Sequence, residues 1–73
     1  MSFAEAASAF EDPLSITVPD LGHSLAEERF ALIGQSKNQY LVVVAHVERG
    51  DIIRIISARI ASSAERRTYE EGH

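Results

Sequence analysis

The chain has 73 residues, of which 45% are hydrophobic, with a net charge of −4 and no cysteine. Its length allows one domain, spanning residues 1–73, with a small core, and its hydrophobic content excludes a disordered chain. The absence of cysteine excludes disulfides and thiolate chemistry and is consistent with a cytoplasmic protein. No stretch is apolar over a membrane-spanning length, and the N-terminus lacks a signal-peptide pattern.

Basic residues are concentrated in the middle of the chain. All seven lie between Arg29 and Arg67, a window with only three acidic residues and therefore a net charge of +4. The other eight acidic residues lie toward the two ends. This asymmetry permits an anionic ligand, although solvated acidic ends around a few arginines also explain it.

The chain begins with a predicted helix and a short strand. Ser2, with Glu5 three residues later, forms a capping-box pattern that predicts a helix up to Phe10, which a proline then ends. Residues 14–18 alternate between apolar and polar, which predicts a strand. A loop over residues 19–27 follows it.

Three longer strands come next. They are predicted over Glu28–Gln35, Gln39–Val47 and Asp51–Arg59. The short connections predict hairpins with two-residue turns, in which Asn38 and Gly50 are suited to positive φ. A second capping box, Ser62 with Glu65, predicts a helix over residues 62–71. The order predicts an α+β fold, an antiparallel β-meander of about four strands flanked by an N-terminal and a C-terminal helix.

Two-residue turns also decide which side chains share a face of the sheet. They place Arg29 opposite His46, and Tyr40 opposite Arg59 with Ser57 nearby. That face is polar at both ends, whereas the other face is the better core and is expected to pack against both helices. The predicted core residues are Phe30, Leu32, Leu41, Val43, Ile52 and Ile56.

Arg54 falls on the predicted core face, apart from Arg59. A guanidinium is costly to bury and keeps its charge. Either the aliphatic part of the Arg54 side chain covers apolar surface at an edge while its guanidinium meets water or a carboxylate such as Glu28, or the whole side chain protrudes as a phosphate ligand. The pattern leaves both roles open.

The sequence lacks the motifs of several kinds of site. Its three histidines lack the spacing of zinc ligands, and it contains no glycine-rich phosphate loop and no nucleophile elbow. We therefore expect neither a metal nor a cofactor. The remaining chemistry is RNA cleavage without a metal ion, which needs a proton carrier and cations that stabilise the phosphorane.

His46 is the candidate proton carrier, with Arg29 as a phosphate clamp, although a histidine can also cap a strand end. Further candidates for phosphate binding are Arg54, Arg59, Arg66 and Arg67. Tyr40 or Tyr69 can stack on a base. Tyr69 also fits a residue that packs the last helix against the sheet.

Long segments of the chain resemble a known family. The run L-V-V-V-A-H-V-E-R-G-D-I-I-R-I-I-S-A-R, followed by A-S-S-A-E-R-R-T-Y-E-E, resembles the BrnT family of bacterial type II toxins. The segments S-F-A-E-A-A-S-A-F-E-D-P and E-E-R-F-A-L-I-G-Q-S also fit, in the right order. The resemblance covers nearly the whole chain, and I-R-I-I-S-A-R with the downstream E-R-R-x-Y is its most specific part.

The resemblance implies a RelE-like ribonuclease toxin that cleaves RNA in the cytoplasm and inhibits translation. It also implies a ribbon-helix-helix antitoxin of the BrnA type, through which any DNA contact would pass, in a homodimer or hetero-oligomer. Polar residues carried over by position are His46, Glu48, Arg49, Arg54, Ser57, Arg59, Arg66, Arg67 and Tyr69. The catalytic candidates are His46, Arg54 and Arg59. The RNA-binding candidates are Arg29, Tyr40, Arg49, Ser57, Arg66, Arg67 and Tyr69.

The chain departs from the family pattern at its N-terminus. Family members usually begin with a further strand and a basic helix ending near K-H-G, and neither precedes S-F-A-E-A here. We therefore expect a shortened domain with an open sheet edge. The alternative function is a catalytically inactive interaction module that binds an antitoxin or itself.

Overall fold

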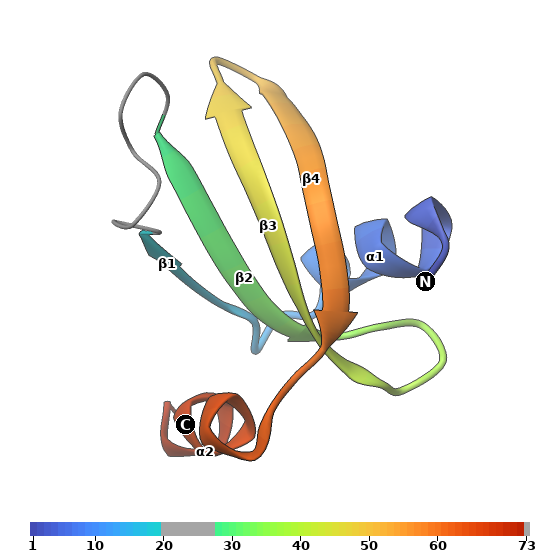
Figure 1. The fold of residues 1–73 in the computed structure, drawn as a ribbon, viewed down its shortest axis with the longest axis vertical. Helices are drawn as coiled ribbons and strands as arrows, with labels where there is room; N and C mark the ends of the chain where they lie inside the picture. The colour runs from blue at the N-terminus through green and yellow to red at the C-terminus, as the bar shows by residue number, and fades with distance from the viewer. Residues whose placement is uncertain (20–27, 73) are drawn as a thin grey trace.

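The fold is a four-stranded antiparallel sheet with one helical segment on each face (Figure 1). The computed structural model describes residues 1–19 and 28–72. The elements are α1 (Phe3–Ser8), the 3-10 helix η1 (Ala9–Glu11), β1 (Ile16–Pro19), β2 (Arg29–Gln35), β3 (Leu41–Arg49), β4 (Ile52–Ile60) and α2 (Ser63–Glu71). The strands lie side by side in chain order, which confirms the predicted α+β meander. Most of the predicted loop, residues 20–27, lies outside the described residues.

The two predicted capping boxes have different outcomes. Ser62 and Glu65 form the complete reciprocal box at the start of α2. At α1, the Ser2 hydroxyl accepts a hydrogen bond from the Glu5 N–H, but the Glu5 carboxylate bonds the side chain and the N–H of Asn38. Glu5 thus ties α1 to the turn between β2 and β3. Hydrogen bonds there, that of Ser36 foremost, lower the pKa of Glu5.

The first hairpin differs from the predicted two-residue turn. Three residues separate the pair Ser36 and Tyr40, and the turn is closed by hydrogen bonds at 2.8 Å from Ser36 N–H to Tyr40 O and from Gln39 N–H to Ser36 O. Gln39, not Asn38, adopts positive φ, at 69°. A three-residue loop with its last residue in the left-handed region is a common hairpin connection. The extra residue shifts the register by one, so Arg29 lies opposite Val47 instead of His46.

The second hairpin contains a β-bulge that the sequence pattern did not predict. Gly50, with φ of 58°, and Asp51 form a two-residue turn that closes the pair Arg49 and Ile52. From that turn β4 pairs regularly with β3 up to Ile55, which lies opposite His46. Pairing then resumes one residue later, with Ser57 opposite Ala45. Ile56 has no partner in β3. An extra residue of this kind reverses the alternation of side chains beyond it.

The helical segments pack on opposite faces, so the prediction of one shared core face was wrong. On one face, which we call the α1 face, Ala6 and Ala9 cluster with Leu32, Val42 and Val44. Gly34 permits this approach, because a Cβ at this position would lie 2.9 Å from the carbonyl oxygen of Ala9.

The other face, which we call the α2 face, carries a second cluster. It consists of Ile33, Leu41 and Val43, with Tyr69 of α2 and Ala61 packed against it. Because both faces of β3 are covered, this strand supplies most of the core. Each fully buried valine in it contributes roughly 1.5 to 3 kcal/mol of hydrophobic stabilisation.

β4 is the last strand of the sheet, and its outer edge lies next to no other strand of the described residues (Figure 1). Four of its isoleucines are exposed: Ile52, Ile53, Ile56 and Ile60. Ile52 and Ile56 were predicted core residues. That prediction was wrong, because neither belongs to the clusters in which the helical segments pack against the sheet. None of the described helices is long and apolar enough to span a membrane.

Candidate functional site

The bulge in β4 brings the polar residues of that strand to one face. Ser57 and Arg59 lie opposite Ala45 and Val43, whereas Arg54, on the other side of the bulge, lies opposite Val47. All three partners in β3 belong to the α2 face, because they are separated by even numbers of residues. Arg54, Ser57 and Arg59 therefore share the α2 face, contrary to the predicted separation of the two arginines.

Two further arginines lie at the same end of the α2 face as Arg54. Val47 pairs with Arg29 on one side and with Arg54 on the other, so the three side chains form a row across β2, β3 and β4. Arg49, two residues after Val47, projects from the same face. Three guanidinium groups thus surround one apolar residue, and we call Arg29, Arg49 and Arg54 the arginine cluster.

A small hollow opens within the arginine cluster. It has a volume of about 140 Å³ and is lined by Val47, Arg49, Ile52 and Arg54. Arg54 is exposed and forms no ion pair with any described residue. The acidic residue of β3 in this region, Glu48, lies on the α1 face. Hydrogen-bond donors and apolar walls around a water-accessible hollow suit an anionic group attached to an apolar body.

Arg59 lies about five residues along β4 from Arg54, a separation of roughly 15 Å. Its guanidinium donates two hydrogen bonds of 2.6 Å to the two carboxylate oxygens of Glu65 in α2. This bidentate contact is the main reason why the pKa of Glu65 is lowered to about 2 and that of Arg59 is raised. The same carboxylate accepts the Ser62 N–H of the capping box. Arg59 therefore joins α2 to the sheet, and a phosphate at this position would compete with Glu65.

His46 lies on the α1 face and is fully buried, with 0% of its surface exposed. Its ring meets Phe10 edge-on, with centroids 4.9 Å apart, and stacks with Phe30 at 5.8 Å. Its Nε2 lies 3.0 Å from Oε2 of Glu48, and its Nδ1 lies 3.3 Å from the Val44 carbonyl oxygen. The predicted pairing of His46 with Arg29 was wrong, because the two residues lie on opposite faces.

The two tyrosines also lie apart from the arginines. Tyr69 packs against the α2-face core and donates a 2.7 Å hydrogen bond to Asp12 Oδ2. Burial and this carboxylate raise the pKa of Tyr69 to about 12. Tyr40 is 57% exposed but borders Ile60 on the α1 face, so its predicted position opposite Arg59 was wrong.

Arg66 and Arg67 are exposed on α2. Successive helical residues are rotated by about 100°, so Arg67 points roughly opposite to Glu65, which faces the sheet. Arg66 projects from the side of the helix. Neither belongs to the arginine cluster.

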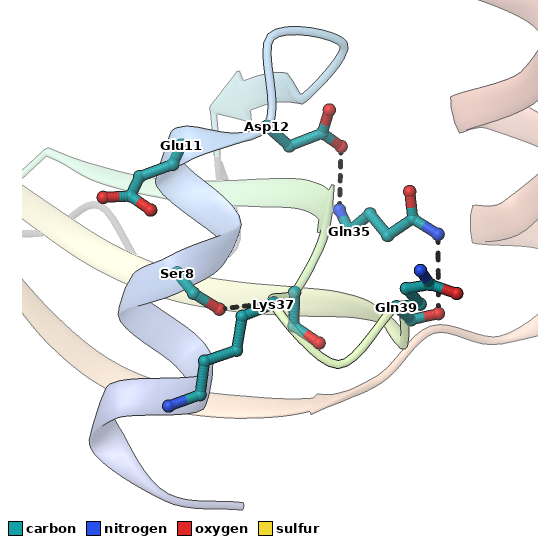
Figure 2. Close-up of a pocket in the computed structure, with 7 residues that line it drawn as sticks. Ser8, Glu11, Asp12, Gln35, Lys37 and Gln39 are labelled. Atoms are coloured by element: carbon teal, nitrogen blue, oxygen red, sulfur yellow. Dashed lines mark hydrogen bonds between the residues drawn. The ribbon is translucent and has the colours of Figure 1, made fainter.

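A second hollow, of about 240 Å³, lies where η1 meets the turn between β2 and β3 (Figure 2). Its polar groups hold the two segments together: Lys37 N–H donates to Ser8 Oγ and Gln35 N–H donates to Asp12 Oδ2, both at 2.8 Å. Asp12 also accepts the Tyr69 hydroxyl. These groups are therefore part of a structural junction, and no predicted site residue lines this hollow.

The described residues contain no group of three or more histidine, cysteine or acidic side chains that could hold a metal ion. His23 lies outside the described residues. The arginine cluster was missed by sequence reasoning, although each of its members had been singled out separately. The cluster forms because of a three-residue turn and a bulge, and neither of these has a marker in the sequence.

Comparison with known proteins gives one result that identifies the family. No curated protein matches the chain at a significant level. The model of the family described as the ribonuclease toxin, BrnT, of a type II toxin-antitoxin system matches residues 1–65. This match covers most of the chain, including the four strands of the described residues and the start of α2. The chain therefore belongs to the BrnT family of ribonuclease toxins.

Proposed function

We propose that the chain cleaves RNA without a metal ion and that the α2 face of its sheet binds the RNA backbone. The observation that supports this most directly is the convergence of Arg29, Arg49 and Arg54 around Val47, with Ser57 and Arg59 further along the same face. Family membership supports the type of reaction.

Guanidinium groups have the chemistry that this role requires. Each stays charged, binds phosphate oxygens through two parallel hydrogen bonds and can stabilise the additional negative charge of a phosphorane. The net charge of the whole chain is −4, so the cluster is a local positive surface on an acidic protein. Such a surface directs RNA to one face. We assign Arg54 to direct phosphate contact and Arg59 to phosphate contact in competition with Glu65, whereas buried His46 and half-buried Tyr69 support the fold.

In the proposed function the chain acts in the cytoplasm, where cleavage of RNA inhibits translation. A BrnA-type antitoxin neutralises it by forming a hetero-oligomer, and any contact with DNA is made by that partner. Arg66 and Arg67 on the exposed side of α2 are available for additional backbone contacts.

A second candidate function is a protein-interaction module without ribonuclease activity. One observation favours it: the histidine that sequence reasoning selected as proton carrier is enclosed between two phenylalanines and inaccessible to RNA. This module would keep the antitoxin-binding surface and form stable complexes without toxicity.

The test is an RNA cleavage assay in EDTA, paired with a growth assay in bacteria that express the chain. We expect RNA breakdown in EDTA, growth arrest, and a loss of both in Arg54→Ala. Lys37→Ala removes an exposed charge outside the cluster and serves as the matched control. Intact RNA at high concentrations of folded protein would leave the interaction module as the function, and a requirement for Mg²⁺ would contradict the metal-independent step.

RNA affinity gives a second readout. Loss of one phosphate contact in Arg54→Ala should reduce the slope of log affinity against log salt by about 0.7 to 1. An unchanged slope would show that Arg54 does not contact phosphate.

A further inference from the structure

We infer that the outer edge of β4 is a docking site for an extended segment of a partner protein in which acidic and apolar residues alternate. Three features of β4 carry this inference: its open hydrogen-bonding edge, its exposed isoleucines and the separation of charge between its two faces. It rests on the proposed function in only one respect, the competition with RNA described below.

The backbone of β4 offers hydrogen-bonding groups to another strand. Ala61 N–H donates to Leu41 O across the β3–β4 ladder. Groups alternate in direction along an antiparallel strand, so Ile60 and Ala58 direct their N–H and C=O groups outward. No described strand lies on that side. The opposite edge of the sheet, β1, has only four residues and ends with Pro19, which limits strand addition there.

The side chains along β4 differ between its two faces. On the α2 face, Arg54, Ser57 and Arg59 are polar and exposed. On the α1 face, Ile53 and Ile60 are exposed to 49% and 54%. A strand added to this edge would present its alternate side chains to these two faces. Acidic residues on the α2 side and apolar residues on the α1 side would match both.

Hollows at both ends of β4 support the same pattern. The hollow of about 140 Å³ beside Arg49 and Arg54 lies on the α2 face and fits a carboxylate side chain. The other, of about 350 Å³, lies beside Ile60 on the α1 face, where Met1 and Tyr40 supply further apolar wall. An extended segment of about eight residues spans the length of β4 between them.

A second copy of the chain matches this edge less well than an acidic segment does. Two-fold antiparallel pairing of β4 with itself would continue the α2 face from one copy to the next. It would place two copies of Arg54, which has no ion pair with a described residue, on one surface, and like charges on neighbouring strands are destabilising. The charge of β4 therefore favours an acidic partner.

The probe is an acetylated and amidated peptide of about eight residues in which Glu and Val alternate, added to the full chain. We expect binding by titration calorimetry and slower hydrogen exchange at the amides of Ala58 and Ile60. A peptide with Gln in place of Glu is the control for charge and should bind at least about tenfold more weakly.

Variants of the chain test each half of the recognition. Arg54→Glu should weaken peptide binding at least about tenfold, whereas Lys37→Glu, the same change of charge outside β4, should alter it less than about twofold. Ile60→Asn should also weaken binding, with Leu14→Asn, at a similarly exposed leucine near the opposite edge, as control. Ala58→Pro removes an outward N–H without removing a ladder hydrogen bond and should abolish binding.

Three results would overturn the inference. The first is the absence of peptide binding at millimolar concentration. The second is binding that survives both Ala58→Pro and Ile60→Asn, which would place the peptide elsewhere. A concentration-dependent dimer with protected Ala58 and Ile60 amides, lost in Ala58→Pro, would also overturn it, by showing that a second copy occupies the edge.

An RNA arm separates this inference from the proposed function. If both hold, the peptide should compete with RNA for the chain, because both engage Arg54. RNA cleavage without peptide binding would refute the edge site alone, and peptide binding without RNA cleavage would refute the proposed ribonuclease alone.

Discussion

The two faces of one sheet handle polar residues in opposite ways. On the α1 face, His46 is enclosed between Phe10 and Phe30, and both ring nitrogens have acceptors nearby. On the α2 face, Arg54 is exposed and Ser57 lies open beside it. Histidine is the more common acid–base catalyst, and yet His46 is less accessible to solvent than Arg54. A histidine on a strand indicates a site only if its face is open, and the face depends on register.

The largest effect is expected from a break in the α1 face. His46→Ala removes a fully buried ring from its contacts with Phe10 and Phe30 and should lower the free energy of unfolding by about 2 to 4 kcal/mol. Urea unfolding measures this change. Glu48→Gln, at the exposed end of the same contact, is the control and should have a smaller effect. A fully stable His46→Ala chain that had lost RNA cleavage would return His46 to the candidate catalytic residues.

The second effect concerns the junction between α2 and the rest of the fold. Tyr69→Phe removes the hydrogen bond to Asp12 and should lower stability by about 1 to 2 kcal/mol. The pKa of Tyr69 is raised from its ordinary 10.0 to about 12, so folding favours the neutral phenol. The contribution of the neutral Tyr69 phenol to the free energy of unfolding is therefore complete below pH 10 and is lost as pH rises toward 12.

The loss of stability at alkaline pH can be assigned to the ionisation of Tyr69 by absorbance. In a Tyr40→Phe chain, Tyr69 is the remaining tyrosine, and its absorbance near 295 nm reports its ionisation. Ionisation at pH 10 in the folded protein would contradict the buried contact with Asp12.

A smaller effect is expected from the ion pair between α2 and β4. The pKa of Glu65 is lowered from 4.5 to about 2, with the hydrogen bond to Arg59 as the largest cause. Its contribution to stability is therefore complete above pH 4.5 and is lost as pH falls toward 2. Because the Arg59 side chain is 60% exposed, Glu65→Gln should cost only about 1 kcal/mol at pH 7. A double-mutant cycle with Arg59→Gln isolates the pair, and a coupling energy of zero would show that other contacts hold α2 in place.

The smallest effect on stability is expected on the open part of the α2 face. Arg54→Ala should change the free energy of unfolding by less than about 0.5 kcal/mol, because the side chain is exposed. Urea unfolding of the Arg54→Ala and His46→Ala variants compares the free energy that one polar residue contributes on each face. A loss above about 2 kcal/mol in Arg54→Ala would indicate a structural role for this arginine.

Local signals in the sequence predicted the elements well. Ser62 and Glu65 marked the start of α2, and alternation of apolar residues gave the strands within about two residues of their observed ends. The family resemblance, which rests on the same segments, is confirmed. These signals depend on neighbouring residues, which a sequence displays directly.

The assignment of side chains to faces was not predictable in the same way. Gln39 adopts positive φ although glycine and asparagine are the usual residues there, and nothing in I-I-R-I-I-S-A-R marks Ile56 as a bulge. Each departure shifts the register by one residue. Because side chains alternate, a one-residue error moves a whole strand to the wrong face, and this error separated Arg54 from Arg59 in the prediction.

The unpaired Ile56 also has a genetic consequence. Loss of its single codon would leave every other amino acid of the chain in place, and yet the two halves of β4 would fall back into strict alternation. Arg54 and Arg59 would then be four residues apart along a regular strand, so both would stay on the α2 face. An in-frame deletion of these three nucleotides is thus expected to leave the arginine surface whole. The bulge is therefore a position at which the gene can lose a codon without separating Arg54 from Arg59.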